Sequence, residues 1–366
     1  MGFSIIILTF IFITGLVIGS FLNVVILRTV SEESIVFPAS KCPKCQTPLK
    51  WYHNIPVLSY IFLRGKCAFC HEHISLQYPI VELLTGFLFV GLFLKICTPF
   101  DLLFGLEAMN PISWYQVIVY AVSLIIACLF IAIAGTDIIE KKVSDAHTYP
   151  LIGVGILYSF IYSIGTFIMY TKANGMPKID LNFFLTCPLL YSVAAALAGF
   201  VIMEIVSRLG LFLVGARAFG EGDSYIAAGI GAVFGALLGC SPTRSNFLLI
   251  FEVLIGILVL SVVIQLILTL PIFIKKLFTS KNWKTLIALD GFITYTIIHC
   301  LLWYNGLLTK QPLYWTSTAI LLLLGLYTCK ELICGLKNNN AANGLYLPFG
   351  PAMIIAGFIA LFTIAF

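Results

Sequence analysis

The chain alternates long apolar segments with short polar connections. Ten segments are apolar enough, over a sufficient length, to cross a membrane as helices, which takes about 20 residues each. They cover approximately residues 3–27, 80–98, 113–135, 149–169, 184–206, 224–240, 247–274, 286–308, 313–333 and 349–366. The sixth is the shortest and the richest in glycine and alanine. Because small side chains let helices approach closely, we expect this segment at the centre of a bundle.

The composition excludes a soluble globular protein. Hydrophobic residues occupy 60% of the 366 positions and charged residues 10%, whereas soluble domains carry about 25% charged residues. The sequence therefore predicts an all-α polytopic membrane protein in contact with lipid. The net charge of +5 is spread over many connections, without a run of like charges. We therefore expect no nucleic-acid partner.

The basic residues predict an orientation. Most of the 21 Lys and Arg residues fall in alternate connections, which become the inner ones if the N-terminus lies outside. The first apolar segment has neither a basic region before it nor a small-x-small cleavage site. We therefore expect a retained anchor rather than a cleaved signal peptide.

The longest polar connection, residues 28–79, is predicted to be cytosolic and contains two CxxC pairs, Cys42 with Cys45 and Cys67 with Cys70. Two such pairs can complete a tetrahedral four-cysteine zinc site of the structural kind. Two disulfides or four unrelated thiols are the alternatives, and a reducing cytosol disfavours disulfides. Two histidines adjoin the second pair, but four cysteines already fill such a site.

Two aspartates lie at the predicted cytosolic ends of apolar segments. Asp137 follows the third segment and Asp223 opens the sixth, where it is preceded by Gly220 and Gly222. Facing carboxyl groups do not both ionise at neutral pH, so one can activate a water while the other donates a proton. This is the chemistry of aspartic peptidases. The glycines would let a substrate backbone pass close by, and the helix dipole suggests Asp223 as the base.

Each aspartate also has a structural interpretation. Asp is a common helix N-cap, which would account for Asp223, and Asp137 would be an interfacial charge beside the lysines that follow it. A small ion transporter is a further hypothesis. It would place acids near the centres of broken helices, whereas both aspartates lie at the ends of their segments. The residues alone leave catalytic and structural roles open.

Several blocks of the sequence resemble the type IV prepilin peptidases, the leader peptidase/N-methyltransferases of the GxGD aspartic class. They comprise GLVIGSFLNVVILR at 15–28, the cysteine blocks at 42–86, GEGD at 220–223 and LPFGPAMIIAGFIAL at 347–361. Asp137 and Asp223 match the catalytic aspartates of that family. The blocks follow the family's order and cover about three-quarters of the chain.

This resemblance implies an enzyme of the bacterial inner membrane. It would cleave the leader of type IV prepilins, or of similar precursors in type II secretion or competence, at the cytosolic face. It would then methylate the new N-terminal amine with S-adenosylmethionine. Asn23, Arg28 and Glu82 lie in matching blocks and would belong to the methyl-transfer region, with helix-end anchoring as the alternative. Residues 28–79 contain no glycine-rich nucleotide fingerprint, so a peptidase that uses the loop only for recognition stays open.

The chain also departs from the family pattern. Ser224 and Tyr225 follow the GEGD box, where an apolar residue and Lys are usual. One segment has no counterpart in the usual eight-helix plan and adds two spans. The expected parts are a first transmembrane helix at 1–27, the four-cysteine loop at 28–79, a peptidase core at 80–276, the insert at 282–335 and a closing helix at 345–366.

Overall fold

A computed structural model describes most of the chain. The described residues are 2–37, 39–97, 114–141, 143–174, 187–214, 219–240, 247–279, 283–304 and 348–363, together with isolated positions between 316 and 331. Most of the described residues are helical, and the only β-pairing among them consists of two isolated bridges. The predicted all-α class is confirmed. The span expected at 313–333 lies largely outside the described residues, as do residues 345–347 of the closing segment.

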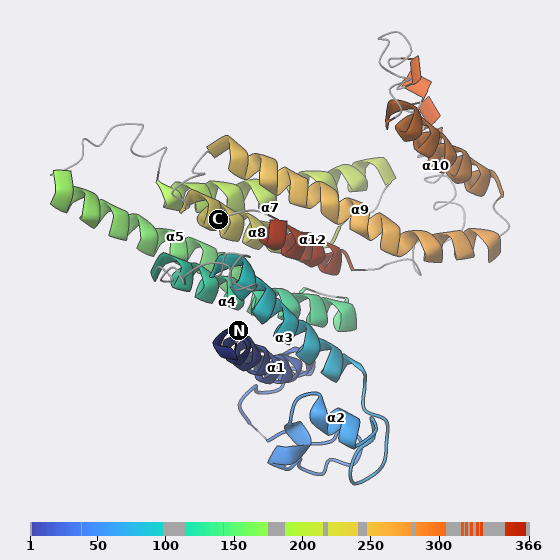
Figure 1. The fold of residues 1–366 in the computed structure, drawn as a ribbon. Coiled ribbons are helices and arrows are strands. Elements are labelled where there is room, and N and C mark those ends of the chain that lie inside the picture. The colour runs from blue at the N-terminus through green and yellow to red at the C-terminus, as the bar shows by residue number, and fades with distance from the viewer. Residues whose placement is uncertain are drawn as a thin grey trace. The chain divides into compact units, whose positions relative to one another are not determined.

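The helices coincide with the apolar segments of the sequence (Figure 1). They are α1 (Gly2–Val30), α3 (Gln77–Ile96), α4 (Trp114–Glu140), α5 (Asp145–Asn174), α7 (Pro188–Val214), α8 (Glu221–Gly239), α9 (Phe247–Thr279), α10 (Trp283–Tyr304) and α12 (Gly350–Thr363). Seven of them, α1, α3, α4, α5, α7, α8 and α9, contain stretches long and apolar enough to cross a membrane. These stretches match the first seven predicted spans. α12 is a shorter apolar helix.

The chain divides into two compact units. The first comprises Met1–Arg208, Ala218–Val262 and Pro348–Phe366, and the second comprises Leu209–Arg217 and Val263–Leu347. The predicted insert lies within the second unit, together with α10. The first unit contains every residue for which the sequence predicts a functional role. α12 also belongs to it, although this helix follows the insert in the sequence.

α8 is the buried helix of the first unit, as its small residues predict. Almost all of its side chains are shielded from the surface. A Cβ atom at Gly231 would overlap the Ala195 carbonyl of α7, and one at Gly229 would lie 2.6 Å from the Leu151 side chain of α5. The Ser192 hydroxyl of α7 donates to the Ala232 carbonyl at 2.8 Å. The backbones of α7 and α8 therefore approach at distances that only glycine permits.

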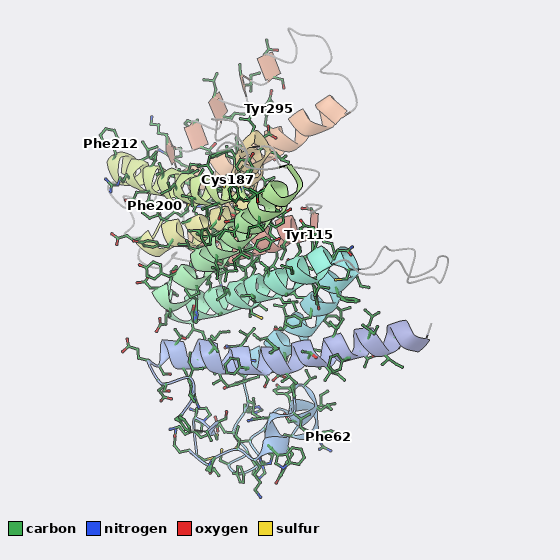
Figure 2. The ribbon with its side chains drawn as sticks, turned by 90° about the vertical axis from the view of Figure 1, so that its left-hand side faces the viewer. Phe62, Tyr115, Cys187, Phe200, Phe212 and Tyr295 are labelled. Atoms are coloured by element: carbon green, nitrogen blue, oxygen red, sulfur yellow. The ribbon has the colours of Figure 1, made fainter. Side chains whose placement is uncertain are left out.

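α1 and α3 form a second close pair. A Cβ atom at Gly15 would lie 2.7 Å from Gly86 Cα, and one at Gly19 would lie 2.7 Å from Glu82 Cα. The two helices therefore run antiparallel. Their connection carries a 3-10 helix, η1 (Trp51–Asn54), and a short helix, α2 (Leu58–Phe62). This connection lies alongside α1 (Figure 2).

Candidate active site and metal centre

Asp137 lies in the last turn of α4 and is 2% exposed. The helix ends three residues later, at Glu140, because Lys141 leaves the helical conformation with φ 56°. The Lys141 N–H still donates to the Asp137 carbonyl at 2.8 Å. The carboxyl oxygen Oδ2 is buried, and the Gly350 backbone of α12 lies next to it. This differs from the solvated interfacial charge that is the alternative interpretation of Asp137.

Asp223 lies in the first turn of α8 and is 3% exposed. Gly220, whose backbone is extended, is the N-cap of the helix and donates its N–H to Asp223 Oδ2 at 3.0 Å. The carboxylate therefore stabilises the start of α8 from the third helical position rather than as the N-cap itself. Its structural role leaves room for a chemical one, because it is buried next to a second carboxyl group.

Three segments meet at these aspartates. A Cβ atom at Gly350, the first residue of α12, would clash with Asp137 Oδ2 and lie 3.0 Å from the Ile226 side chain of α8. A Cβ atom at Gly222 would clash with Val143, in the turn between α4 and α5. The carboxyl groups of Asp137 and Asp223 are close enough to interact electrostatically. This proximity supports the predicted catalytic pairing of the two aspartates, which stays a prediction.

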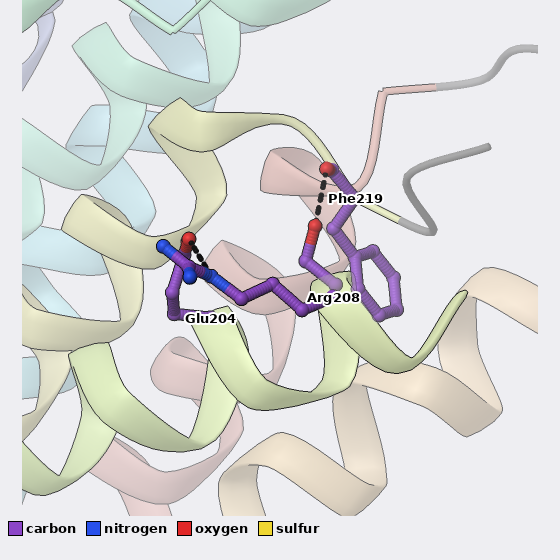
Figure 3. Close-up of polar contacts among 4 residues, drawn as sticks. Glu204, Arg208 and Phe219 are labelled. Atoms are coloured by element: carbon purple, nitrogen blue, oxygen red, sulfur yellow. Dashed lines mark hydrogen bonds and ion pairs between the residues drawn. The ribbon is translucent and has the colours of Figure 1, made fainter. Parts of the chain in front are cut away.

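Aromatic and polar contacts hold the segment before α8 in place. The rings of Phe219 and Phe349 pack with centroids 4.4 Å apart. The Ser207 hydroxyl of α7 donates to the Phe219 carbonyl at 2.9 Å (Figure 3). One turn earlier, Glu204 accepts a hydrogen bond from Arg208 at 2.8 Å. The Phe349 and Ser207 contacts position the backbone that leads into Gly220, whereas the Glu204–Arg208 pair lies within α7.

The two residues after Asp223, which depart from the family pattern, have different surroundings. Ser224 is buried, and its hydroxyl has no partner among the described residues. The Tyr225 ring packs against Phe200 and Tyr149, with centroids 5.4 and 5.7 Å away. Position 225 therefore belongs to an aromatic cluster beside the aspartates.

The four predicted cysteines come together in the connection between α1 and α3. Their Sγ atoms all lie within 4.8 Å of one another, and those of Cys42 and Cys70 are 3.9 Å apart. Sulfurs at the corners of a tetrahedron with metal–sulfur distances of about 2.3 Å are about 3.8 Å apart. The cysteines are free thiols. The donor set therefore fits a tetrahedral metal ion, and the disulfide alternative is not supported.

The two CxxC pairs adopt the same local fold. In each, the residue that follows the second cysteine has a positive φ, 57° at both Gln46 and His71, and donates its N–H to the carbonyl of the first cysteine. Hydrogen bonds at Thr47 lower the pKa of the Cys45 thiol to about 6. The hydrogen bonds of the first turn therefore favour the thiolate form of Cys45, which is the form that binds metal.

The three residues expected in a methyl-transfer region separate into two places. The Asn23 side chain donates to the Tyr78 carbonyl at 3.1 Å, and Glu82 Oε2 accepts the Val57 N–H at 2.7 Å, so both lie where α1, α3 and the cysteine connection meet. Asn23 Oδ1 is buried without a partner among the described residues. Arg28 instead donates to the carbonyls of Ser34 and Ile35 and holds the end of α1.

Comparisons with known proteins agree with these observations. Residues 13–96 match the family described as Bacterial Peptidase A24 N-terminal domain. A prepilin leader peptidase/N-methyltransferase of Klebsiella pneumoniae is 31% identical over 233 residues, which cover 62% of this chain and 85% of that protein. The protein of that description from Neisseria gonorrhoeae is 30% identical over 247 residues. These residues cover 61% of this chain and 72% of that protein. The chain belongs to the prepilin leader peptidase/N-methyltransferase family.

A third relative with this description, from Myxococcus xanthus, is 32% identical over 232 residues. These residues cover 63% of the chain but only 57% of that protein's length. No solved structure gave a significant match.

Some residues that contact the two aspartates or the segments next to them were not predicted from the sequence. The sequence marks the block around Gly350 as a matching one, but not its contact with Asp137. Nothing in the sequence marks Val143 or Ser207 as part of the site, because an apolar residue in a turn and a serine in an apolar helix are common. His147 of α5 is buried, and its Nε2 lies 3.2 Å from the Thr29 hydroxyl at the end of α1.

Proposed function

We propose that the protein cleaves the leader of prepilins or pilin-like precursors, with Asp137 and Asp223 as the catalytic pair. The observation that carries this proposal is the meeting of α4, α8 and α12 at two buried, interacting carboxyl groups. An ion transporter with acids at span centres is disfavoured, because both aspartates lie in terminal helical turns. The names of the relatives supply the substrate class.

Hydrolysis would follow the pattern of an aspartic peptidase. One carboxylate takes a proton from a water that attacks the scissile carbonyl carbon, and the protonated partner donates to the departing amine. We assign the base role to Asp223, because it accepts the Gly220 N–H and lies at the start of α8, where the helix dipole favours negative charge. Gly222 lets the Val143 side chain pack where a Cβ atom would otherwise lie, one residue before Asp223.

We further propose that a methyl-transfer site lies where α1, α3 and the cysteine connection meet. S-adenosylmethionine would supply the methyl group there. Zinc held by the four cysteines would fold the connection without taking part in the reaction, because a closed four-thiolate site leaves no open position. Asn23 and Glu82 line this place, and the unpartnered Asn23 Oδ1 is available to a ligand. Arg28 is better explained as an anchor of α1.

The protein would work in the bacterial inner membrane, with its N-terminus outside and both sites facing the cytosol. The positive-inside distribution of Lys and Arg supports this orientation. Reporter fusions to the connection after α1 and to the end of α3 would test it. A periplasmic signal from the first fusion would contradict the orientation.

The decisive experiment incubates purified protein with a prepilin and S-adenosylmethionine and measures the mass of the mature product. Loss of the leader with a gain of about 14 Da shows both activities, since a methyl group replaces one hydrogen. Loss of the leader alone indicates a peptidase that uses the cysteine connection for recognition. An unprocessed precursor with native protein would reject the proposal. Asp223→Asn provides the inactive control.

A further inference from the structure

The segment between the two CxxC pairs contains a strained turn that directs it toward the helices. Leu58 donates its N–H to the Pro56 carbonyl at 2.5 Å, and Val57 has φ 59° and ψ −47°. This is the rare form of γ-turn, with a positive φ that is costly for a β-branched side chain. Glu82, a buried residue of α3, accepts the Val57 N–H at 2.7 Å. A buried carboxyl group thus fixes the turn against α3.

This hydrogen bond determines the depth of the turn. α3 has 20 residues, which at about 1.5 Å per residue is just the length needed to cross the hydrocarbon core. Glu82 is the sixth of these residues, so its Cα lies about 7.5 Å inside the first residue of the span. The Val57 N–H is hydrogen-bonded to the Glu82 side chain. Val57 therefore lies near the boundary between the lipid headgroups and the acyl chains. Phe62 is seen beside the length of α1 rather than beyond its end (Figure 2).

At this depth, α2 exposes an apolar face. Leu58, Ile61 and Phe62 are spaced so that they share one side of the helix. They are 52%, 60% and 80% exposed. Ile80 and Leu84 of α3, on either side of Glu82 in the sequence, are exposed as well. The protein therefore leaves a large apolar face uncovered at a level where lipid, not water, surrounds its helices.

The residues around this face suit a lipid surface. Trp51 and Tyr52 of η1 are exposed, and these side chains favour the membrane interface. Lys50, Arg64 and Lys66 are exposed in the same connection, and cations attract the phosphates of anionic lipids. A soluble partner would have to bind the apolar face of α2 at the level of the first turns of α3, which lie in the membrane.

We propose that α2 docks in the membrane, with Leu58, Ile61 and Phe62 inserted at the acyl–headgroup boundary of the leaflet where α1 ends. η1 and the flanking cations would lie at the headgroups. The connection is then held by lipid on one side and by Glu82 on the other. Docking keeps the four-cysteine cluster at the membrane surface. This inference depends on α1 and α3 spanning the membrane and not on either proposed activity.

Photo-crosslinking of the full chain in nanodiscs of phosphatidylethanolamine and phosphatidylglycerol tests the proposal. p-Benzoylphenylalanine replaces Phe62 in one variant and Glu72, an exposed acidic residue of the second CxxC turn, in the control. After irradiation, mass spectrometry should detect phospholipid adducts at position 62 far more often than at position 72. Equal adduct yields, or crosslinking of position 62 to a second copy of the chain in place of lipid, would overturn it.

A second measurement uses the unmodified protein, so it does not depend on whether the variant folds. Hydroxyl radicals oxidise accessible aromatic side chains, and without lipid Phe62 is more exposed than Phe69 of the second CxxC turn, which is 42% exposed. Insertion should reverse this order in nanodiscs, with Phe62 oxidised several-fold more slowly than Phe69. Faster oxidation of Phe62 in intact nanodiscs would contradict docking even if adducts form.

Discussion

The rings of Phe219 and Phe349 are in contact, with their centroids 4.4 Å apart. Each ring directly precedes a glycine at the aspartate pair: Gly220 donates to Asp223, and Gly350 lies against Asp137. Because these segments are far apart in the sequence, the ring contact is part of what closes the site.

We expect Phe349→Ala to destabilise the protein by about 3–5 kcal/mol, as for other buried phenylalanines, and to reduce leader cleavage. A double-mutant cycle with Phe219→Ala should give a coupling of about 0.5–1.5 kcal/mol, measured by unfolding in mixed detergent. Phe212→Ala, at an exposed ring, is the control. Additive effects of the two substitutions would show that the ring contact contributes nothing specific.

Asp137→Asn and Asp223→Asn should each abolish leader cleavage while the protein stays folded. The amide oxygen of Asn can still accept the Gly220 N–H, so the start of α8 is preserved, but neither variant can form the carboxylate and acid pair. A cleavage assay together with size-exclusion chromatography measures both effects. Asp145→Asn, at an exposed residue, is the matched control, and its cleavage activity should stay close to that of the unsubstituted protein. Near-normal turnover by Asp223→Asn would remove this residue from the mechanism.

Gly350→Ala should strongly reduce cleavage, because the added methyl group would clash with Asp137 Oδ2 and displace the carboxyl group or the start of α12. Gly153→Ala in α5 is the control, since a Cβ atom there meets no other atom within 4 Å. That substitution should be neutral or stabilise the helix by up to about 1 kcal/mol. Equal activity of the two variants would mean that the contact between Gly350 and Asp137 has no role in catalysis.

The purified protein should contain one zinc ion per chain, and Cys67→Ser should lose it, because three thiolates hold the ion less tightly than four. Cys128→Ser, in α4 and outside the cluster, should keep a full metal content. Elemental analysis of reduced protein measures both. Zinc loss should also increase hydrogen exchange in residues 39–76. Metal content that is unchanged in Cys67→Ser would argue against the four-cysteine site.

The sequence predicts the helices and the candidate site to different extents. Long apolar segments predict the spans, because a helix in lipid must satisfy its backbone internally. The CxxC spacing predicts the cysteine cluster, because short loops can bring the thiols of each pair together. Asp137 and Asp223 are recognisable as candidates, but their proximity depends on the packing of the helices that carry them. The γ-turn at Val57 could not be predicted, since a buried carboxylate far along the chain stabilises it.

The position of Gly350 against Asp137 also affects when the site can form during synthesis. A ribosome delivers the helices in order, so α4 and α8 enter the membrane while α12 and the long segment before it are still to be made. Until α12 inserts, the Asp137 carboxyl group lacks the neighbour that encloses it. A nascent chain therefore carries both aspartates without a finished site, and hydrolytic competence would come only with the last helix.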